Sequence, residues 1–197
     1  MSILSRYLTA SAYLERQVGW NAMNGLTKED DEMLKSMPKE LLLDLFHMHI
    51  RNLWRVDGLY FLGIEEKFGT EAATQIDTNC WKILGRLEAR ELKNLLKIKK
   101  NDIPTLMHAL RNTSWSLYQE EKQLESSPTK GIYRVTKCRV QETRISKTLD
   151  VFPCKSVRFS YLKAFVEEFN PNIRVDCRFA PPEKRPKNVW CEWGFTA

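Results

Sequence analysis

Residues 154–179, CKSVRFSYLKAFVEEFNPNIRVDCRF, change their hydrophobic period within one stretch, and this change decides the fold. In the first part, large apolar residues recur at every fourth position: Val157, Tyr161, Phe165 and Phe169. That spacing predicts an amphipathic helix, which ends at Asn170-Pro171 because the residue before a proline avoids helical dihedral angles. Residues 173–179 then alternate between apolar and charged side chains, which predicts a strand with one buried face.

A hairpin is predicted before this stretch. Residues 131–146, GIYRVTKCRVQETRIS, are rich in β-branched and aromatic residues, and the turn-like SSPTKG precedes them. We expect them to form a strand that pairs with LYQEEKQLE at residues 117–125, a weaker strand candidate.

A last strand is predicted at residues 189–195, VWCEWGF. Alternation places Cys191 and Trp193 on an inward face and Trp190 on the opposite face. We expect Trp190 to be exposed beside the loop APPEKRPK and to contact a ligand or partner.

The first half of the chain has helical spacing throughout. Two long helices are predicted between residues 38 and 96, with Gly69 ending the first and Thr70 capping the second. Asp102 is expected to open a short third helix. The fold class is therefore α+β, with an N-terminal helical layer followed by a β-β-α-β-β antiparallel half. The predicted organisation is an arm (1–36), a helical half (37–112) and an α+β half (113–197), the two halves forming one compact domain.

Composition limits the class of protein. The chain has 197 residues, 43% of them hydrophobic, and no apolar run long enough for a membrane span. The N-terminal residues do not have the pattern of a secretory signal, so we expect a cytoplasmic protein without a membrane partner. The five cysteines form an odd set without CxxC spacing, which favours reduced thiols over a disulfide framework.

The distribution of charge and the absence of common motifs limit the classes of binding partner and of enzyme chemistry. Residues 99–197 hold 18 Lys and Arg against 11 Asp and Glu, which is a net charge of +7. These cations are scattered and accompany no nucleic-acid-binding motif, so a small anionic molecule is favoured over nucleic acid. The chain contains no GxGxxG, GxxxxGK[ST], GxSxG or HExxH motif, which argues against dinucleotide, P-loop, α/β-hydrolase and zincin chemistry.

Several acids lie in the predicted helices among apolar residues. Asp77 and Glu88 are eleven residues apart and share a helical stripe, and Asp57 and Glu65 raise the same question. If buried, such carboxylates must form ion pairs, bind a substrate or a metal, or be neutral. The sequence leaves these alternatives open.

The cysteines have two interpretations. Cys177 and Cys191 fall on apolar faces of neighbouring strands, where a free thiol packs as a small hydrophobe. Cys138 and Cys154 have polar neighbours, and Cys154 is expected at a helix N-terminus near arginine, where the thiolate is favoured. These four thiols are also the candidate ligands of a metal, although the sequence names no metal or other cofactor.

A family resemblance rests on four segments: NLWRVDGLYFLGIEEKFGTEAATQIDTNCWKILGRLEAR, CRVQETRI, FPCKSVRFSYLKAFVEEFNPNIRVDC and WCEWGF. They resemble an uncharacterised bacterial and archaeal family, itself similar to the 2-aminothiazoline-4-carboxylate hydrolase family, which opens a cyclic thiazoline carboxylate. Glu192 stands where that hydrolase family tends to have Asp, so the substrate does not transfer. Ala180 stands where the closer family usually has Cys, which weakens the case for a metal cluster.

The resemblance implies a hydrolase-like enzyme for a small anionic substrate, such as a sulfur- or nitrogen-containing heterocycle. In this hypothesis Arg144, with Gln141 beside it, binds the substrate carboxylate, and Trp190 stacks on the ligand. The nucleophile or ligand is Cys154 or Cys191, and the proton carrier is Asp57 or Glu88. The alternative is a non-catalytic module that binds a small ligand and resembles vinyl-reductase-type domains. The sequence leaves a homo-oligomer open.

Overall fold

The computed structural model describes residues 26–197. The chain divides into two compact units, residues 1–49 and 50–197, and the boundary falls within helix α3 (Lys39–Phe68). The predicted arm, 1–36, lies largely outside the described residues. Its described end forms α2 (Lys28–Ser36), which begins after Thr27 and buries no residue.

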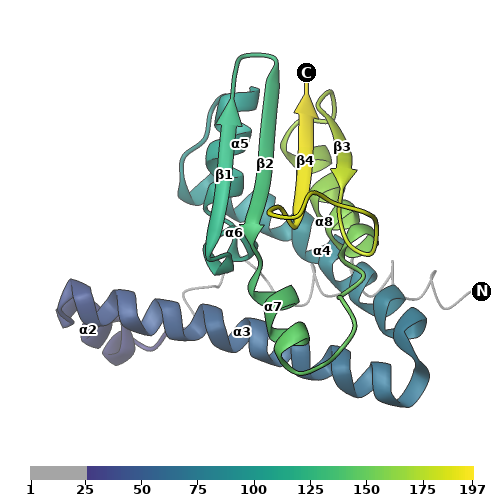
Figure 1. Ribbon diagram of the computed structural model, residues 1–197. Coiled ribbons are helices and arrows are strands. Elements are labelled where there is room, and N and C mark those ends of the chain that lie inside the picture. Colours follow the sequence, from purple (N-terminus) through teal and green to yellow (C-terminus); the bar gives the residue numbers. More distant parts are fainter. Residues whose placement is uncertain (1–25) are drawn as a thin grey trace, which may run out of the picture. The chain divides into compact units, whose positions relative to one another are not determined.

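The second unit contains the fold that the sequence predicts. It is an α+β structure with the helices concentrated in the earlier part of the chain and a four-stranded antiparallel sheet in the later part (Figure 1). After α3 the elements are α4 (Thr70–Leu95), α5 (Ile103–Arg111), α6 (Ser114–Tyr118), β1 (Glu121–Ser126), β2 (Lys130–Lys137), α7 (Arg139–Ser146), α8 (Cys154–Phe169), β3 (Arg174–Phe179) and β4 (Cys191–Thr196).

The helix ends follow local chemistry. Gly69 separates α3 from α4 with a φ of 86°, a value that glycine adopts without steric cost. The prediction that Thr70 caps α4 is wrong: Gly69 occupies the cap, and the Thr70 hydroxyl instead donates to Glu65 Oε1 at 3.0 Å. Asp102 caps α5 as predicted, because its carboxylate accepts the Thr105 N–H at 3.0 Å.

The sheet has the strand order β1-β2-β4-β3, so the last strand in sequence is central. Helices α5 and α8 pack on one face of the sheet, and α4 packs along α8 (Figure 1). The core lies between them, where Tyr133, Trp193 and Phe195 are fully buried against Tyr161 and Phe165 of α8.

The predicted strand at residues 131–146 is half wrong. Strand β2 ends at Lys137, Cys138 occupies the cap position, and the remainder forms α7. The β-branched residues that suggested a strand are outweighed by Gln141, Glu142 and Arg144, which have good helix propensity. Gln141 and Arg144 are three residues apart, so a helix places both buried side chains on one face.

The predicted exposure of Trp190 is also wrong. Its exposed fraction is 8%, and it belongs to the hydrophobic core. The backbone N–H of Trp190 donates to Val135 O at 2.8 Å, and the guanidinium of Arg185 lies 3.5 Å from the ring centroid. Trp190 is therefore held against the end of β2 and covered by Arg185 of the preceding loop, although alternation assigned it to an exposed face.

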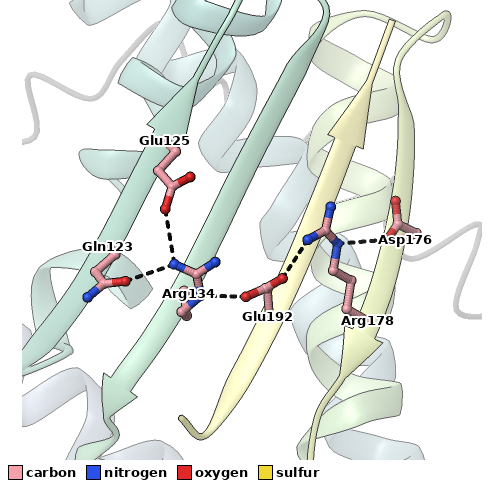
Figure 2. Close-up of polar contacts among 6 residues, drawn as sticks. All are labelled: Gln123, Glu125, Arg134, Asp176, Arg178 and Glu192. Carbon is pink, nitrogen blue, oxygen red and sulfur yellow. Dashed lines mark hydrogen bonds and ion pairs between the residues drawn. The ribbon is translucent and has the colours of Figure 1, made fainter. Parts of the chain in front are cut away.

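The outer face of the sheet carries a paired polar network. Figure 2 shows Glu192 of β4 between Arg134 of β2 and Arg178 of β3. Arg134 Nε and Arg178 Nη1 each donate to a different oxygen of this carboxylate, the second at 2.7 Å. Burial disfavours the charge of Glu192, but the two arginines outweigh it and hold its pKa below the usual value. These charges are therefore satisfied within the fold.

No helix among the described residues is both long enough and apolar enough to span a membrane.

The close contact between α4 and α8 generates a stability prediction. A Cβ added at Gly85 would lie 2.5 Å from Tyr161 O, a backbone atom that cannot move alone. We expect Gly85→Ala to lower the free energy of unfolding by about 1–3 kcal/mol. Gly63→Ala is the control, because nothing lies within 4 Å of that position on α3; it should raise stability by up to about 1 kcal/mol. Urea unfolding followed by circular dichroism measures the free energy of unfolding of both variants. An unfolding free energy of Gly85→Ala equal to that of wild type would contradict the close packing of α4 on α8.

Candidate functional site

The second unit contains a cavity of about 280 Å³. Its walls come from α3, α4, α6, α7, the segment 147–152 and the start of α8. Fourteen of its 23 lining residues are apolar, and the other nine are polar or charged: Arg55, Asp57, Asp77, Gln119, Gln141, Thr143, Arg144, Lys147 and Arg158. A small apolar cavity with a few polar groups is the usual form of a small-molecule site.

Arg158 of α8 is the most unusual of these polar groups. Its exposed fraction is 3%, and its guanidinium carbon lies 4.4 Å from the ring centroid of Trp115 and 4.7 Å from that of Trp81. Trp54 and Tyr161 complete this aromatic cage, at 5.8 and 4.8 Å. Aromatic faces attract the cation, but its Nε and Nη1 atoms have no hydrogen-bond acceptor among residues 26–197. Unpaired buried donors of this kind carry a large desolvation cost.

The cage is assembled by stacking between elements far apart in sequence. The Trp54 ring of α3 stacks on Trp81 of α4 and on Tyr118 of α6, with centroids 4.8 Å apart in both pairs. The Trp54 indole N–H donates to Ser114 O at 3.3 Å, which fixes the ring over α6. These contacts determine where the cavity wall lies around Arg158.

Asp57 and Asp77 form an acidic pair in the same wall. The Trp81 indole N–H donates to Asp57 Oδ1 at 3.1 Å, whereas Asp77 Oδ2 has no partner. Burial, together with the neighbouring Asp57, raises the pKa of Asp77 to about 7, although Arg158 and Trp81 oppose the shift. Burial also raises the pKa of Asp57, against the hydrogen bond from Trp81 and the charge of Arg158. Two neighbouring carboxyls with raised pKa values therefore lie in the cavity wall, and that of Asp77 is close to neutral pH.

The structure brings five of the sequence-predicted site residues to the cavity, Cys138, Cys154, Asp57, Gln141 and Arg144, whereas Cys177 is not among its lining residues. Glu88, Cys191 and Trp190 are not among the lining residues. Glu88 has a structural role beside the cage, because it accepts the Ser114 N–H and the Tyr161 hydroxyl, each at 2.6 Å.

Arg144 and Gln141 are committed to contacts within the fold. Arg144 makes a bidentate pair with Glu65 of α3, at 2.9 and 3.0 Å, and its Nε donates to Asp150 O at 2.6 Å. The Gln141 amide donates to Phe152 O and accepts from Phe152 N, both at 2.9 Å. Both residues fix the cavity wall, and Arg158 is the cation left without an acceptor for two of its N–H groups.

The expected thiolate at Cys154 is not supported. Cys154 does begin α8 as predicted, but burial raises the pKa of its thiol, and Arg158 offsets this only in part. Burial likewise raises the pKa of Cys138 to about 12 and that of Cys177 to about 11, and it holds the pKa of Cys191 well above the usual value. Within residues 26–197, no three His, Cys, Asp or Glu side chains converge as a metal site, so the four thiols do not form the ligand set considered from the sequence.

Sequence reasoning missed Arg158, which counted only as one of several scattered cations. It left Asp77 open between an ion pair, a substrate or metal ligand and a neutral carboxyl. A signal for Arg158 was present, because it shares the buried stripe of α8 with Tyr161, Leu162 and Phe165 at steps of three and four residues. A cation on an apolar stripe needs either a partner or a function.

Comparisons with known proteins give a family but no activity. A family model described as a family of unknown function (DUF6125) matches residues 35–197. Neither the curated proteins nor the solved structures gave a match. The resemblance to the 2-aminothiazoline-4-carboxylate hydrolase family therefore stays an expectation from sequence.

The raised pKa of Asp77 predicts how stability depends on pH. The pKa of Asp77 is 3.8 as an ordinary carboxyl and about 7 in the folded chain. At pH values between these two, the folded chain keeps a proton on Asp77 that the unfolded chain has lost. This group therefore destabilises the fold as pH rises. Asp77→Asn should remove that dependence. The unfolding free energy of the variant minus that of wild type should increase by on the order of 3 kcal/mol from pH 4 to pH 8.

The measurement is denaturant unfolding of both proteins across this pH range. Asp44→Asn, a change at an exposed position of α3, is the matched control and should show no such divergence. Parallel pH profiles for wild type and Asp77→Asn would mean that Asp77 titrates as an ordinary carboxyl.

Proposed function

The chain belongs to this family, DUF6125, a family of unknown function, and we propose that it is a hydrolase-like enzyme that binds a small anionic substrate in the cavity of its second unit. The observation that carries the proposal is Arg158, a buried cation in the cavity wall with two N–H groups that lack an acceptor. An anionic group on a ligand would supply the missing acceptor.

The cage around Arg158 favours a carboxylate or a similar oxyanion. A guanidinium presents its N–H groups as a planar fork that matches two carboxylate oxygens. The surrounding rings of Trp54, Trp81 and Trp115 exclude water, and a charge-assisted hydrogen bond is stronger in such surroundings. The Arg144 that the sequence favoured for this role already pairs with Glu65.

The lining also limits the rest of the ligand. The cavity volume of about 280 Å³ lies just below the range of ligand sites, which span roughly 300–1,000 Å³. Aromatic rings form much of its wall, and a flat molecule makes the most contact with such faces. A small planar anion therefore fits better than a flexible chain.

The acidic pair provides the proton transfers that a hydrolysis needs. Asp57, in its ionised form, accepts a proton from a water molecule while that water adds to the substrate's electrophilic carbon. Asp77, in its neutral form, donates a proton to the leaving nitrogen or oxygen as the bond to carbon breaks. One water is consumed, and a proton moving from Asp57 to Asp77 restores the pair. A carboxyl with a pKa of about 7 is well suited to such transfer near neutral pH.

This pair favours an enzyme over the non-catalytic binding module. Binding an anion requires only Arg158, and a second acid in the same wall would weaken that binding by repulsion. Cys154 also lines the cavity, but its raised pKa leaves the thiol protonated near neutral pH, so water is the nucleophile in this proposal.

Benzoate, a small planar carboxylate, is the probe that tests the anion site. Isothermal titration should show binding to wild type, and Arg158→Met should weaken it by about 10- to 100-fold because a charge-assisted hydrogen bond is lost. Arg174→Met, at an exposed position of β3, is the matched control and should bind as wild type does. Circular dichroism confirms that each variant is folded. Equal benzoate affinity in folded Arg158→Met would contradict the site.

The enzymatic part has its own test. Native mass spectrometry of the purified chain identifies a small molecule that it retains, and hydrolysis of that compound is then followed by mass. Asp77→Asn should retain binding but reduce turnover by at least about 100-fold. Turnover unchanged in Asp77→Asn would exclude this carboxyl as the proton donor.

A further inference from the structure

Gln119 is a second polar side chain in the cavity wall that the fold leaves unsatisfied. It occupies the C-cap of α6, lines the cavity and has an exposed fraction of 5%. Both its amide oxygen and its amide nitrogen are buried without a hydrogen-bond partner in the part of the chain that the structure describes. Its backbone N–H, in contrast, donates to Ser116 O at 3.3 Å.

The other buried glutamine shows what a purely structural amide looks like in this fold. Gln141 lines the same cavity, is 1% exposed, and uses both amide atoms in bonds to the Phe152 backbone. Buried amides are normally satisfied in this way, since an unpaired amide in an apolar environment costs free energy. Gln119 departs from that rule at the edge of a ligand-sized cavity.

Gln119 follows the helix that carries a ring of the aromatic cage. Trp115 of α6, Gln119 at its C-cap and Arg158 all line the same cavity. The guanidinium of Arg158 lies over the Trp115 ring, 4.4 Å from its centroid. One small molecule can therefore contact both Arg158 and Gln119.

From this placement we infer that Gln119 determines specificity, by recognising an amide-type edge on the ligand that Arg158 binds. This inference rests on the proposed anion site and names the substrate class more closely. A primary amide presents an acceptor oxygen beside a donor nitrogen, and its complement is an N–H beside a C=O. The ligand is then a planar anion that also carries a lactam, imide or ureide group.

Three commercially available probes separate the two parts of such a ligand. Orotate carries a carboxylate and adjacent N–H and C=O groups on a planar ring. Benzoate carries the carboxylate without that edge, and uracil carries the edge without the carboxylate. Wild type should bind orotate at least about tenfold more tightly than benzoate, since only orotate supplies hydrogen-bond partners to the unpaired amide of Gln119. Uracil should bind more weakly than orotate because it leaves Arg158 unpaired.

Gln119→Leu is the decisive variant, because leucine is apolar and similar in size. It should lose the preference for orotate, weakening orotate about tenfold or more while leaving benzoate affinity within about threefold. Its melting temperature should be equal to or above that of wild type, since an unsatisfied polar group has been removed. Gln119→Met, which keeps an unbranched side chain, gives the same test if the leucine variant does not fold.

The outcomes distinguish this inference from the proposed function. If wild type binds benzoate and orotate equally, or if Gln119→Leu keeps the orotate preference, the amide-edge inference is wrong and the anion site stands. If Gln119→Leu and Gln119→Met both lose stability, Gln119 is structural and the inference fails. If wild type binds neither carboxylate, both the anion site and the inference built on it are contradicted.

Discussion

The burial of Arg158 within an aromatic cage is the constraint on which the site depends. A cation on the inward stripe of α8 prevents that stripe from packing against a plain apolar surface, so rings from α3, α4 and α6 gather around it. Trp54, Trp81, Trp115 and Arg158 all line the cavity, so this cage forms part of its wall. The acids Asp57 and Asp77 line the same wall, where burial raises the pKa of each carboxyl.

Charged side chains on the outer face of the sheet are paired, whereas the buried cation on the helical side is not fully paired. On the outer face, Arg134 and Arg178 share the carboxylate of Glu192, and the network is complete within the chain (Figure 2). On the helical side, Arg158 keeps two N–H groups without an acceptor. Because folds normally satisfy their buried polar groups, the unsatisfied group indicates function and the satisfied network indicates structure.

Sequence patterns predicted the elements whose period is regular. The helix at Cys154–Phe169 and the strand at Arg174–Phe179 follow directly from spacing. The prediction for residues 138–146 was wrong because their β-branched content suggested a strand. The segment forms a short helix whose buried residues are polar. The predicted exposure of Trp190 was wrong because alternation assigns a residue to one face of a strand but does not tell whether that face is covered. At the site, the sequence correctly indicated that Asp57 and Cys154 lie together. It favoured Arg144 over Arg158 as the anion-binding cation, because the ion pair that engages Arg144 joins it to Glu65, far away in sequence.

If Arg158 is the anion-binding group of this chain, a crystal structure with 4-bromobenzoate will show the ligand beside it. The bromine gives an anomalous signal that locates the ligand independently of its shape. We expect the bromine inside the cavity, with carboxylate oxygens about 2.7–3.2 Å from the Arg158 guanidinium nitrogens, as in ordinary charge-assisted hydrogen bonds. Bromine bound only at the basic loop of Lys184, Arg185 and Lys187, with nothing beside Arg158, would contradict it.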